Sequence, residues 1–218
     1  MVEIKFCGLT QPDDAAMAAD LGASYAGVIF AGGPRLVSPE RAREVFAPLS
    51  GSDVRRVGVF GAQPIEEIAQ LARAARVDVV QLHGGATAES VARLRGAFEG
   101  AVWAVERVSG PLSPSSLQGW AATVDAIVLD TAVAGRLGGT GVALDWPGVT
   151  AAVDTVRGGM KVVLAGGLRP GNVAEAVRMV GPDIVDVSSG VEGPTPGVKD
   201  HELMRAFARS ARQSMDEE

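Results

Sequence analysis

The stretch VEIKFCGLTQPDDAAMAADLG at residues 2–22 decides the fold, because it joins a strand to a helix through a short turn. Residues 2–7, VEIKFC, form a short apolar run of the kind that makes a buried strand. Pro12 followed by two acidic residues marks a helix start, and Gly22 stands where a helix C-cap is expected. The turn between them, CGLTQPDD, lacks the G-x-G-x-x-G pattern of an open dinucleotide-binding sheet.

The same alternation occurs eight times along the chain. Strands are predicted at residues 2–7, 25–30, 55–60, 78–83, 101–106, 126–130, 161–166 and 183–188. Helical segments lie between them, with start signals at Ser38, Thr87 and Pro170 and a C-cap at Gly181; the helix near 145–158 has the weakest pattern. Strands alternating with helices indicate parallel βαβ units. Eight such units fill the 218 residues, so we expect residues 1–218 to form a single TIM (β/α)8-barrel domain.

The amino-acid composition narrows the range of possible functions. The net charge of −6 argues against nucleic-acid binding through a basic surface. The single cysteine excludes an internal disulfide or a multi-cysteine metal site and fits a reducing cytoplasm. No apolar run reaches the roughly 18–20 residues that span a bilayer, and the N-terminus does not resemble a signal peptide. We therefore expect a cytoplasmic protein that binds neither nucleic acid nor membranes.

Polar residues stand at the ends of several predicted strands, which is where the active sites of such barrels lie. Cys7 ends the first strand, His83 the fourth and Asp130 the sixth. Lys5 is two residues before Cys7, so it lies on the same face and is expected to lower the pKa of the thiol. A thiolate and a carboxylic acid across one cavity would form a general acid–base pair.

Each of these residues also has an ordinary structural interpretation. A lone cysteine is most often a buried core residue. Asp130 could equally cap a helix or anchor a loop, and His83 could simply pack at a strand end.

Two glycine- and serine-rich loops follow the seventh and eighth strands. Gly166 with Gly167, and Ser188 with Ser189 and Gly190, occupy the usual phosphate site of these barrels. Backbone N–H groups bind phosphate without net positive charge, which agrees with an acidic protein. The GGTG run at 138–141, ending in Gly141, resembles a flexible loop that approaches phosphate, although such clusters are more often plain loops. Arg35, after the second strand, could pair with a carboxylate in bidentate fashion.

Nine stretches in this order resemble the phosphoribosylanthranilate isomerase family of tryptophan biosynthesis over almost the whole chain. They are KFCGLT, GVIF followed by PR, VGVF, VVQLHG, VLDT, GGTG with LDW, LAGGL, DVSSGVE and GVKD. The first is the most specific. The chain differs from the family pattern at two places. The stretch FAGGPR is shorter than the family's usual second loop and lacks its serine, and Leu144 replaces an aromatic residue.

The resemblance implies a TIM barrel that catalyses an Amadori rearrangement with no metal and no cofactor, as a monomer or homodimer. N-(5′-phosphoribosyl)anthranilate would become 1-(2-carboxyphenylamino)-1-deoxyribulose 5-phosphate. Asp130 would be the general acid and Cys7 the general base. Arg35 would bind the anthranilate carboxylate, His83 and Asp186 other parts of the substrate, and the loops with Gly141 the phosphate.

Other functions remain open at this point. The bifunctional isomerase shared by histidine and tryptophan synthesis generally uses two aspartates where this chain has Cys7 and Asp130. Indole-glycerol-phosphate synthase needs an additional N-terminal segment and catalytic lysine and glutamate residues that this chain lacks. A cysteine hydrolase would need Cys7 paired with an oriented His83. In a non-catalytic barrel that binds phosphorylated ligands, Cys7 would be inert packing.

Overall fold

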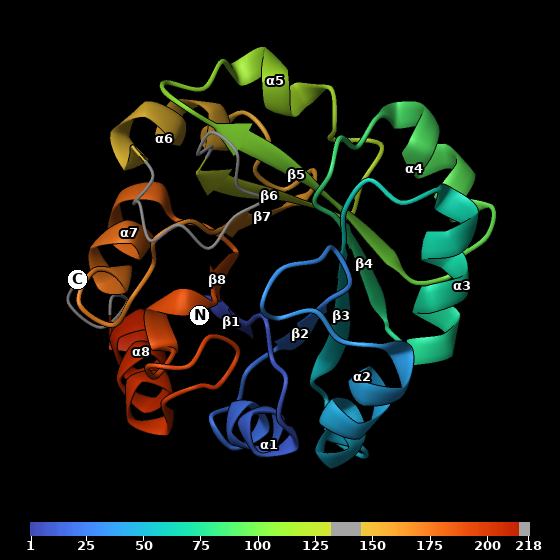
Figure 1. The fold of residues 1–218 in the computed structure, drawn as a ribbon. Coiled ribbons are helices and arrows are strands. Elements are labelled where there is room, and N and C mark those ends of the chain that lie inside the picture. Colours follow the sequence, from blue (N-terminus) through green and yellow to red (C-terminus); the bar gives the residue numbers. More distant parts are fainter. Residues whose placement is uncertain (132–144, 214–218) are drawn as a thin grey trace.

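Eight parallel strands close into a barrel in the computed structural model, which describes residues 1–131 and 145–213 (Figure 1). Each strand pairs with the next along the chain, and β1 pairs with β8. The strands are β1 Glu3–Phe6, β2 Tyr25–Ile29, β3 Arg55–Phe60, β4 Val79–Leu82, β5 Ala101–Val108, β6 Ala126–Thr131, β7 Lys161–Leu164 and β8 Ile184–Val187. The predicted TIM barrel is confirmed, and every predicted strand end lies within two residues of the observed one.

The helices form an outer ring around the barrel (Figure 1). They are α1 Pro12–Asp20, α2 Pro39–Phe46, α3 Ile65–Ala75, α4 Ala88–Arg95, α5 Pro114–Gln118, α6 Trp146–Asp154, α7 Val173–Val180 and α8 His201–Gln213, with short 3-10 turns η1 Ala47–Leu49 and η2 Ser189–Val191. Among the helices that the structure describes, none has the length and apolar character needed to cross a membrane.

The start signals are confirmed for α1, α2 and α4 but not for α7. The Ser38 hydroxyl accepts a hydrogen bond from the Arg41 N–H, and Thr87 forms a capping box with Ser90. The start expected at Pro170 is wrong, because α7 begins at Val173 after a turn. That turn is closed by the side chain of Asn172, whose Oδ1 accepts from the Arg169 N–H.

The barrel buries two separate apolar layers. One lies between the strands and the surrounding helices, and the other fills the lower half of the barrel interior. The interior layer includes Tyr25 and Trp103, whose rings meet edge to face with centroids 4.9 Å apart. Because side chains alternate along each strand, the next inward positions lie above this layer. Those positions carry Lys5, Gln81 and Asp130, all buried and polar.

Candidate active site

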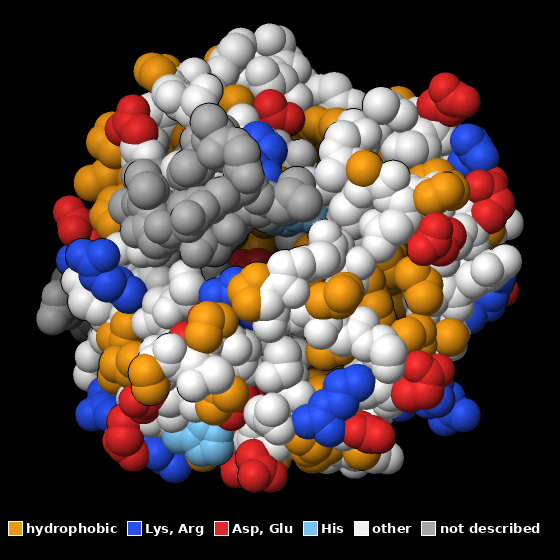
Figure 2. Space-filling model, in the orientation of Figure 1, with side chains coloured by type: hydrophobic (Ala, Val, Ile, Leu, Met, Phe, Trp, Pro, Cys, Tyr) orange, Lys and Arg blue, Asp and Glu red, His pale blue; other side chains and the backbone are white. Residues whose placement is uncertain are grey.

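A cavity of about 620 Å³ opens above the apolar layer, at the carboxyl ends of the strands. Its size is that of a small-molecule site. In the space-filling view a hollow lies near the centre of this face, with a histidine and acidic side chains visible inside it (Figure 2). Every site residue predicted from the sequence within the described ranges lines this cavity: Cys7, Arg35, His83, Asp130, Gly166, Gly167, Asp186, Ser188, Ser189 and Gly190. Gly141 and Leu144 lie outside the described residues.

Cys7 lies beside a buried ion pair. Lys5, which is fully buried, donates from Nζ to Asp186 Oδ2 at 2.6 Å, and the two residues are register partners of β1 and β8. A Cβ atom at Gly27 would lie 3.2 Å from Cys7 Sγ and 3.3 Å from Lys5 Cε. The glycine on β2 therefore leaves the space that these two side chains fill together.

The expected lowering of the Cys7 pKa is only partly correct. The Lys5 cation does lower the pKa of the thiol, as predicted from the spacing. Burial raises it by more, and the Asp186 carboxylate raises it further, so that the pKa of Cys7 lies above its ordinary value. The spacing of Lys5 and Cys7 in the sequence predicted the effect of the cation. It could not predict how deeply Cys7 is buried, or that Asp186 of β8 lies nearby.

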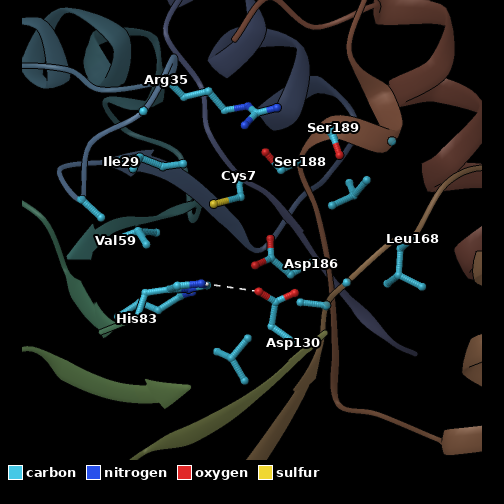
Figure 3. Close-up of a pocket in the computed structure, with 18 of the residues that line it drawn as sticks. Cys7, Ile29, Arg35, Val59, His83, Asp130, Leu168, Asp186, Ser188 and Ser189 are labelled. Atoms are coloured by element: carbon cyan, nitrogen blue, oxygen red, sulfur yellow. Dashed lines mark hydrogen bonds and ion pairs between the residues drawn. The ribbon is translucent and has the colours of Figure 1, made fainter. Parts of the chain in front are cut away.

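Asp130 is linked to His83 across the cavity floor. Asp130 Oδ1 accepts from the Thr131 N–H at 2.9 Å, and Asp130 Oδ2 lies 3.4 Å from His83 Nε2 (Figure 3). On the other side of the ring, Gln81 Nε2 lies 3.3 Å from His83 Nδ1. With the Gln81 amide in this orientation, its NH2 group donates to Nδ1, which leaves the proton on Nε2. Nε2 faces Asp130 but has no hydrogen-bond partner among the described residues.

The same contacts weaken the cysteine-hydrolase interpretation. Both ring nitrogens of His83 face partners other than the thiol, namely Gln81 and Asp130. In Figure 3, Asp186 lies between Cys7 and Asp130, while Arg35 lies on the far side of Cys7. Cys7 and Asp130 thus face one cavity from separated strands, as an acid–base pair requires.

The two loops predicted to bind phosphate lie in contact with each other. A Cβ atom at Gly190 would collide with the Leu168 carbonyl oxygen, so only glycine permits this approach. Gly166 and Gly167 both have positive φ, 82° and 66°. No described residue accepts a hydrogen bond from the backbone N–H groups of Gly167, Ser189 or Gly190. These groups are therefore available to an anion.

Arg35 reaches the cavity despite the shortened loop, but part of its guanidinium is already engaged. Nε and Nη2 donate to the two carboxylate oxygens of Glu192, each at 2.6 Å. Buried Lys199 donates to Glu192 Oε1 at 2.9 Å and to the Ser188 carbonyl at 3.0 Å. Gly8 leaves room for this side chain, because a Cβ atom there would lie 2.6 Å from Arg35 Cδ. Its φ of 69° is also one that favours glycine.

Four polar residues that support the site were not assigned from the sequence. Gln81 orients His83, and Glu192 with Lys199 holds Arg35. Asn172 donates from Nδ2 to the Gly167 carbonyl at 3.0 Å and so shapes the β7–α7 loop. Three of them lie in stretches that carry the family resemblance, VVQLHG, DVSSGVE and GVKD. The Arg35–Glu192 pair joins residues 157 positions apart, so only the fold shows it.

Comparisons with known proteins point to one family over almost the whole chain. The family model described as "N-(5′phosphoribosyl)anthranilate (PRA) isomerase" matches residues 4–210. An N-(5′-phosphoribosyl)anthranilate isomerase of Paramagnetospirillum magneticum is 39% identical, with 97% of each chain covered. One of Rubrobacter xylanophilus is also 39% identical and is covered completely by 97% of this chain.

Solved structures give the same result. The phosphoribosyl anthranilate isomerase of Thermotoga maritima superposes with a TM-score of 0.86 at 34% identity, covering 98% of this chain and 100% of that one. A phosphoribosyl anthranilate isomerase in complex with reduced 1-(o-carboxyphenylamino)-1-deoxyribulose 5-phosphate superposes with a TM-score of 0.83 at 33% identity, with the same coverage. The chain belongs to the N-(5′-phosphoribosyl)anthranilate isomerase family.

Proposed function

We propose that this protein is an isomerase of tryptophan biosynthesis, in which Cys7 and Asp130 convert N-(5′-phosphoribosyl)anthranilate to 1-(2-carboxyphenylamino)-1-deoxyribulose 5-phosphate. The family match supports the reaction. One observation supports the roles of the two residues: a thiol from β1 and a carboxyl group from β6 face the same cavity, between a loop pair with free N–H groups and an arginine.

Asp130 acts first, as the general acid. It gives its proton to the furanose ring oxygen, the C1′–O bond breaks, and the lone pair of the anilino nitrogen forms an iminium. The Thr131 N–H holds the Asp130 carboxyl group by a hydrogen bond, and His83 faces its other oxygen. The ring opens without any co-reactant, because the electron pair released to oxygen is matched by the pair donated from nitrogen.

Cys7 acts second, as the general base. A hydrogen next to an iminium carbon is acidic, so a thiolate can remove it from C2′. The electron pair of the broken C–H bond neutralises the iminium and leaves an enolamine, which tautomerises to the ketone. The hydrogen lost from C2′ is balanced by the one gained at C1′, so the rearrangement is redox-neutral overall.

The two charged ends of the substrate have different binding groups available. In this proposal the phosphate binds at Gly166, Gly167, Ser188, Ser189 and Gly190, whose loops offer amide donors. The anthranilate carboxylate binds Arg35. Asp186 Oδ1 is buried with no hydrogen-bond partner in the described residues, which suits a sugar hydroxyl donor.

The test is turnover of substrate made from anthranilate and phosphoribosyl pyrophosphate by the preceding transferase. Loss of anthranilate-type fluorescence reports the isomerisation. We expect Cys7→Ser and Asp130→Asn each to lower kcat by roughly 10²- to 10⁴-fold. Asp154→Asn, which removes an exposed ion pair on α6, is the control and should stay within about twofold of the wild type.

Near-normal turnover in both site variants would reject the acid–base pair. A wild-type protein that leaves the substrate unchanged but is stabilised by inorganic phosphate would instead favour the phospholigand-binding alternative.

The remaining expectations are part of the same proposal. Residues 1–218 would act as one domain on a phosphorylated small molecule, in the cytoplasm, without nucleic acid, metal or cofactor. A solved relative from Thermotoga maritima is described as dimeric, which supports a homodimer as one of the two expected states.

A further inference from the structure

A cluster of charged side chains joins the loop after β2 to the loop after β8 at the rim of the cavity. Its members are Arg35, Glu192 and Lys199, together with the backbone N–H of Gly197. Glu192 Oε1 accepts from Arg35 Nε at 2.6 Å, from Lys199 Nζ at 2.9 Å and from the Gly197 N–H at 3.1 Å. Among the described residues, Arg35 Nη2 is the donor to Glu192 Oε2.

The cluster is buried and carries an excess of positive charge. The side chain of Lys199 is fully buried, and those of Glu192 and Arg35 are 6% and 15% exposed. Burial raises the pKa of Glu192, but Arg35 and Lys199 together lower it by more, to about 2, so the group is a carboxylate at any physiological pH. Two cations and one anion leave one positive charge to be matched. A substrate carboxylate entering the cavity would supply the missing negative charge.

The geometry leaves one edge of the guanidinium open. Arginine can form two parallel hydrogen bonds through Nε and Nη2, or through Nη1 and Nη2. Glu192 takes the first edge, and no described residue accepts from Nη1. The stem is confined as well, since Cβ atoms at Gly8 and Gly197 would lie 2.6 Å from Arg35 Cδ and 3.7 Å from Arg35 Cγ. Figure 3 shows the head of Arg35 on the cavity side of its loop.

We infer that Glu192, anchored by Lys199, is a positioning residue that presents the open edge of Arg35 to the aromatic carboxylate of the substrate. The inference rests on the proposed function, since it concerns how the anthranilate end of that substrate is selected. Arginine side chains lose rotamer entropy when they bind, and an arginine fixed in advance loses less. Glu192 thereby makes the site prefer ligands that carry the carboxylate.

The opposite reading is that Glu192 competes with the substrate for Arg35. In that case removing the Glu192 charge would free the guanidinium and strengthen binding of the carboxylate. The two readings therefore predict changes of opposite sign in one measurement.

The experiment compares two ligands by calorimetry on the full-length protein. One is reduced 1-(2-carboxyphenylamino)-1-deoxyribulose 5-phosphate, and the other is the matched phenylamino compound without the carboxylate. We expect Glu192→Gln to weaken the first ligand about tenfold and the second less than twofold. In turnover, KM should rise by a similar factor with kcat nearly unchanged. Val198→Ala, an exposed neighbour in the same loop, is the control.

A double-mutant cycle separates positioning from a general structural role. In an Arg35→Met background, Glu192→Gln should no longer affect carboxylate binding, because Glu192 acts through Arg35. If Glu192→Gln folds poorly, Glu192→Asp replaces it. Aspartate keeps the buried charge but is too short to reach both cations, so it should show the loss of carboxylate preference expected for Glu192→Gln.

Equal weakening of both ligands, no effect, or tighter carboxylate binding would each overturn the inference. A failure of the isomerase proposal would be seen separately, in the turnover of the Cys7 and Asp130 variants, and not in these binding constants.

Discussion

At Cys7, burial and a neighbouring carboxylate oppose the effect of a neighbouring cation. Burial and Asp186 raise the pKa of the thiol, while Lys5 lowers it. The thiolate is the form that removes a proton, so its fraction limits the base-catalysed step. Because the pKa lies above the ordinary thiol value of 9.0, the thiolate fraction of the free enzyme should rise with pH throughout the neutral range.

Two substitutions should move this pH dependence in opposite directions. Asp186→Asn removes an anion that disfavours the thiolate, so the titration of the Cys7 thiol should shift to lower pH. Lys5→Met removes the stabilising cation and should shift the titration to higher pH. The rate at which iodoacetamide alkylates the single cysteine, measured as a function of pH, reports the thiolate fraction without substrate, which Asp186 is also expected to bind. Shifts in the same direction would contradict the charge balance.

Glu192 should make stability depend on pH in the acidic range. Its folded pKa of about 2 is below the ordinary 4.5, so its contribution is complete above pH 4.5 and is lost as the pH falls toward 2. Between pH 6 and 3 this amounts to about 2 kcal/mol of unfolding free energy. Urea unfolding of wild type and Glu192→Gln at both values checks it. Parallel losses in the two proteins would exclude the effect.

The sequence placed residues well when their position followed from the end of a strand. Cys7, His83 and Asp130 were expected at the mouth of the barrel, and all three line the cavity. Glu192 was not assigned, because its partner Arg35 is 157 residues away and only the closed barrel brings them together. The chemical roles of these residues remain predictions.

At the scale of elements, strands were more predictable than helix ends. Each strand is a short apolar run, which fixes its position, whereas a helix start depends on one local hydrogen bond. Pro170 has the chemistry of a start, yet the side chain of Asn172 closes a turn there and delays α7 until Val173. Gly181 was predicted correctly, and its φ of 58° shows why glycine suits this position.

Gly181→Ala should destabilise the junction between α7 and β8. Alanine is strained at positive φ, and its Cβ atom would lie 2.9 Å from Arg157 Nη2. That guanidinium donates to the Val180 and Gly181 carbonyls, so the helix end would lose part of its cap. We expect the unfolding free energy in urea to fall by about 1 kcal/mol. Gly171→Ala is the control, because an added Cβ atom there would meet no atom of another described residue within 4 Å. An equal loss there would contradict this explanation.

At the scale of the whole molecule, the barrel must join the two ends of the chain. β1 pairs with β8, and α1 is tied to the segment before α8 through a buried carboxylate. Asp14 Oδ2 accepts from the Lys199 N–H at 3.1 Å, and Asp14 Oδ1 lies 2.9 Å from His201 Nε2. The same segment supplies Lys199 to the charged cluster at the cavity rim. The contacts of Asp14 with this segment therefore contribute both to closing the barrel and to positioning Arg35.

Asp14→Ala should accordingly weaken both global stability and carboxylate binding. Removing a buried acceptor leaves the Lys199 N–H unsatisfied and costs roughly 1–3 kcal/mol. Asp13→Ala is the matched control, because it removes an exposed acidic residue from the same helix turn and costs only the helix-dipole contribution, about 0.5 kcal/mol. Urea unfolding followed by circular dichroism and tryptophan fluorescence gives both values, and calorimetry with the carboxylate ligand gives the binding change.

If Asp14→Ala were no more destabilising than Asp13→Ala, the carboxylate would not be what ties the two ends together. If stability fell while carboxylate binding stayed intact, the rim cluster would be held independently of barrel closure.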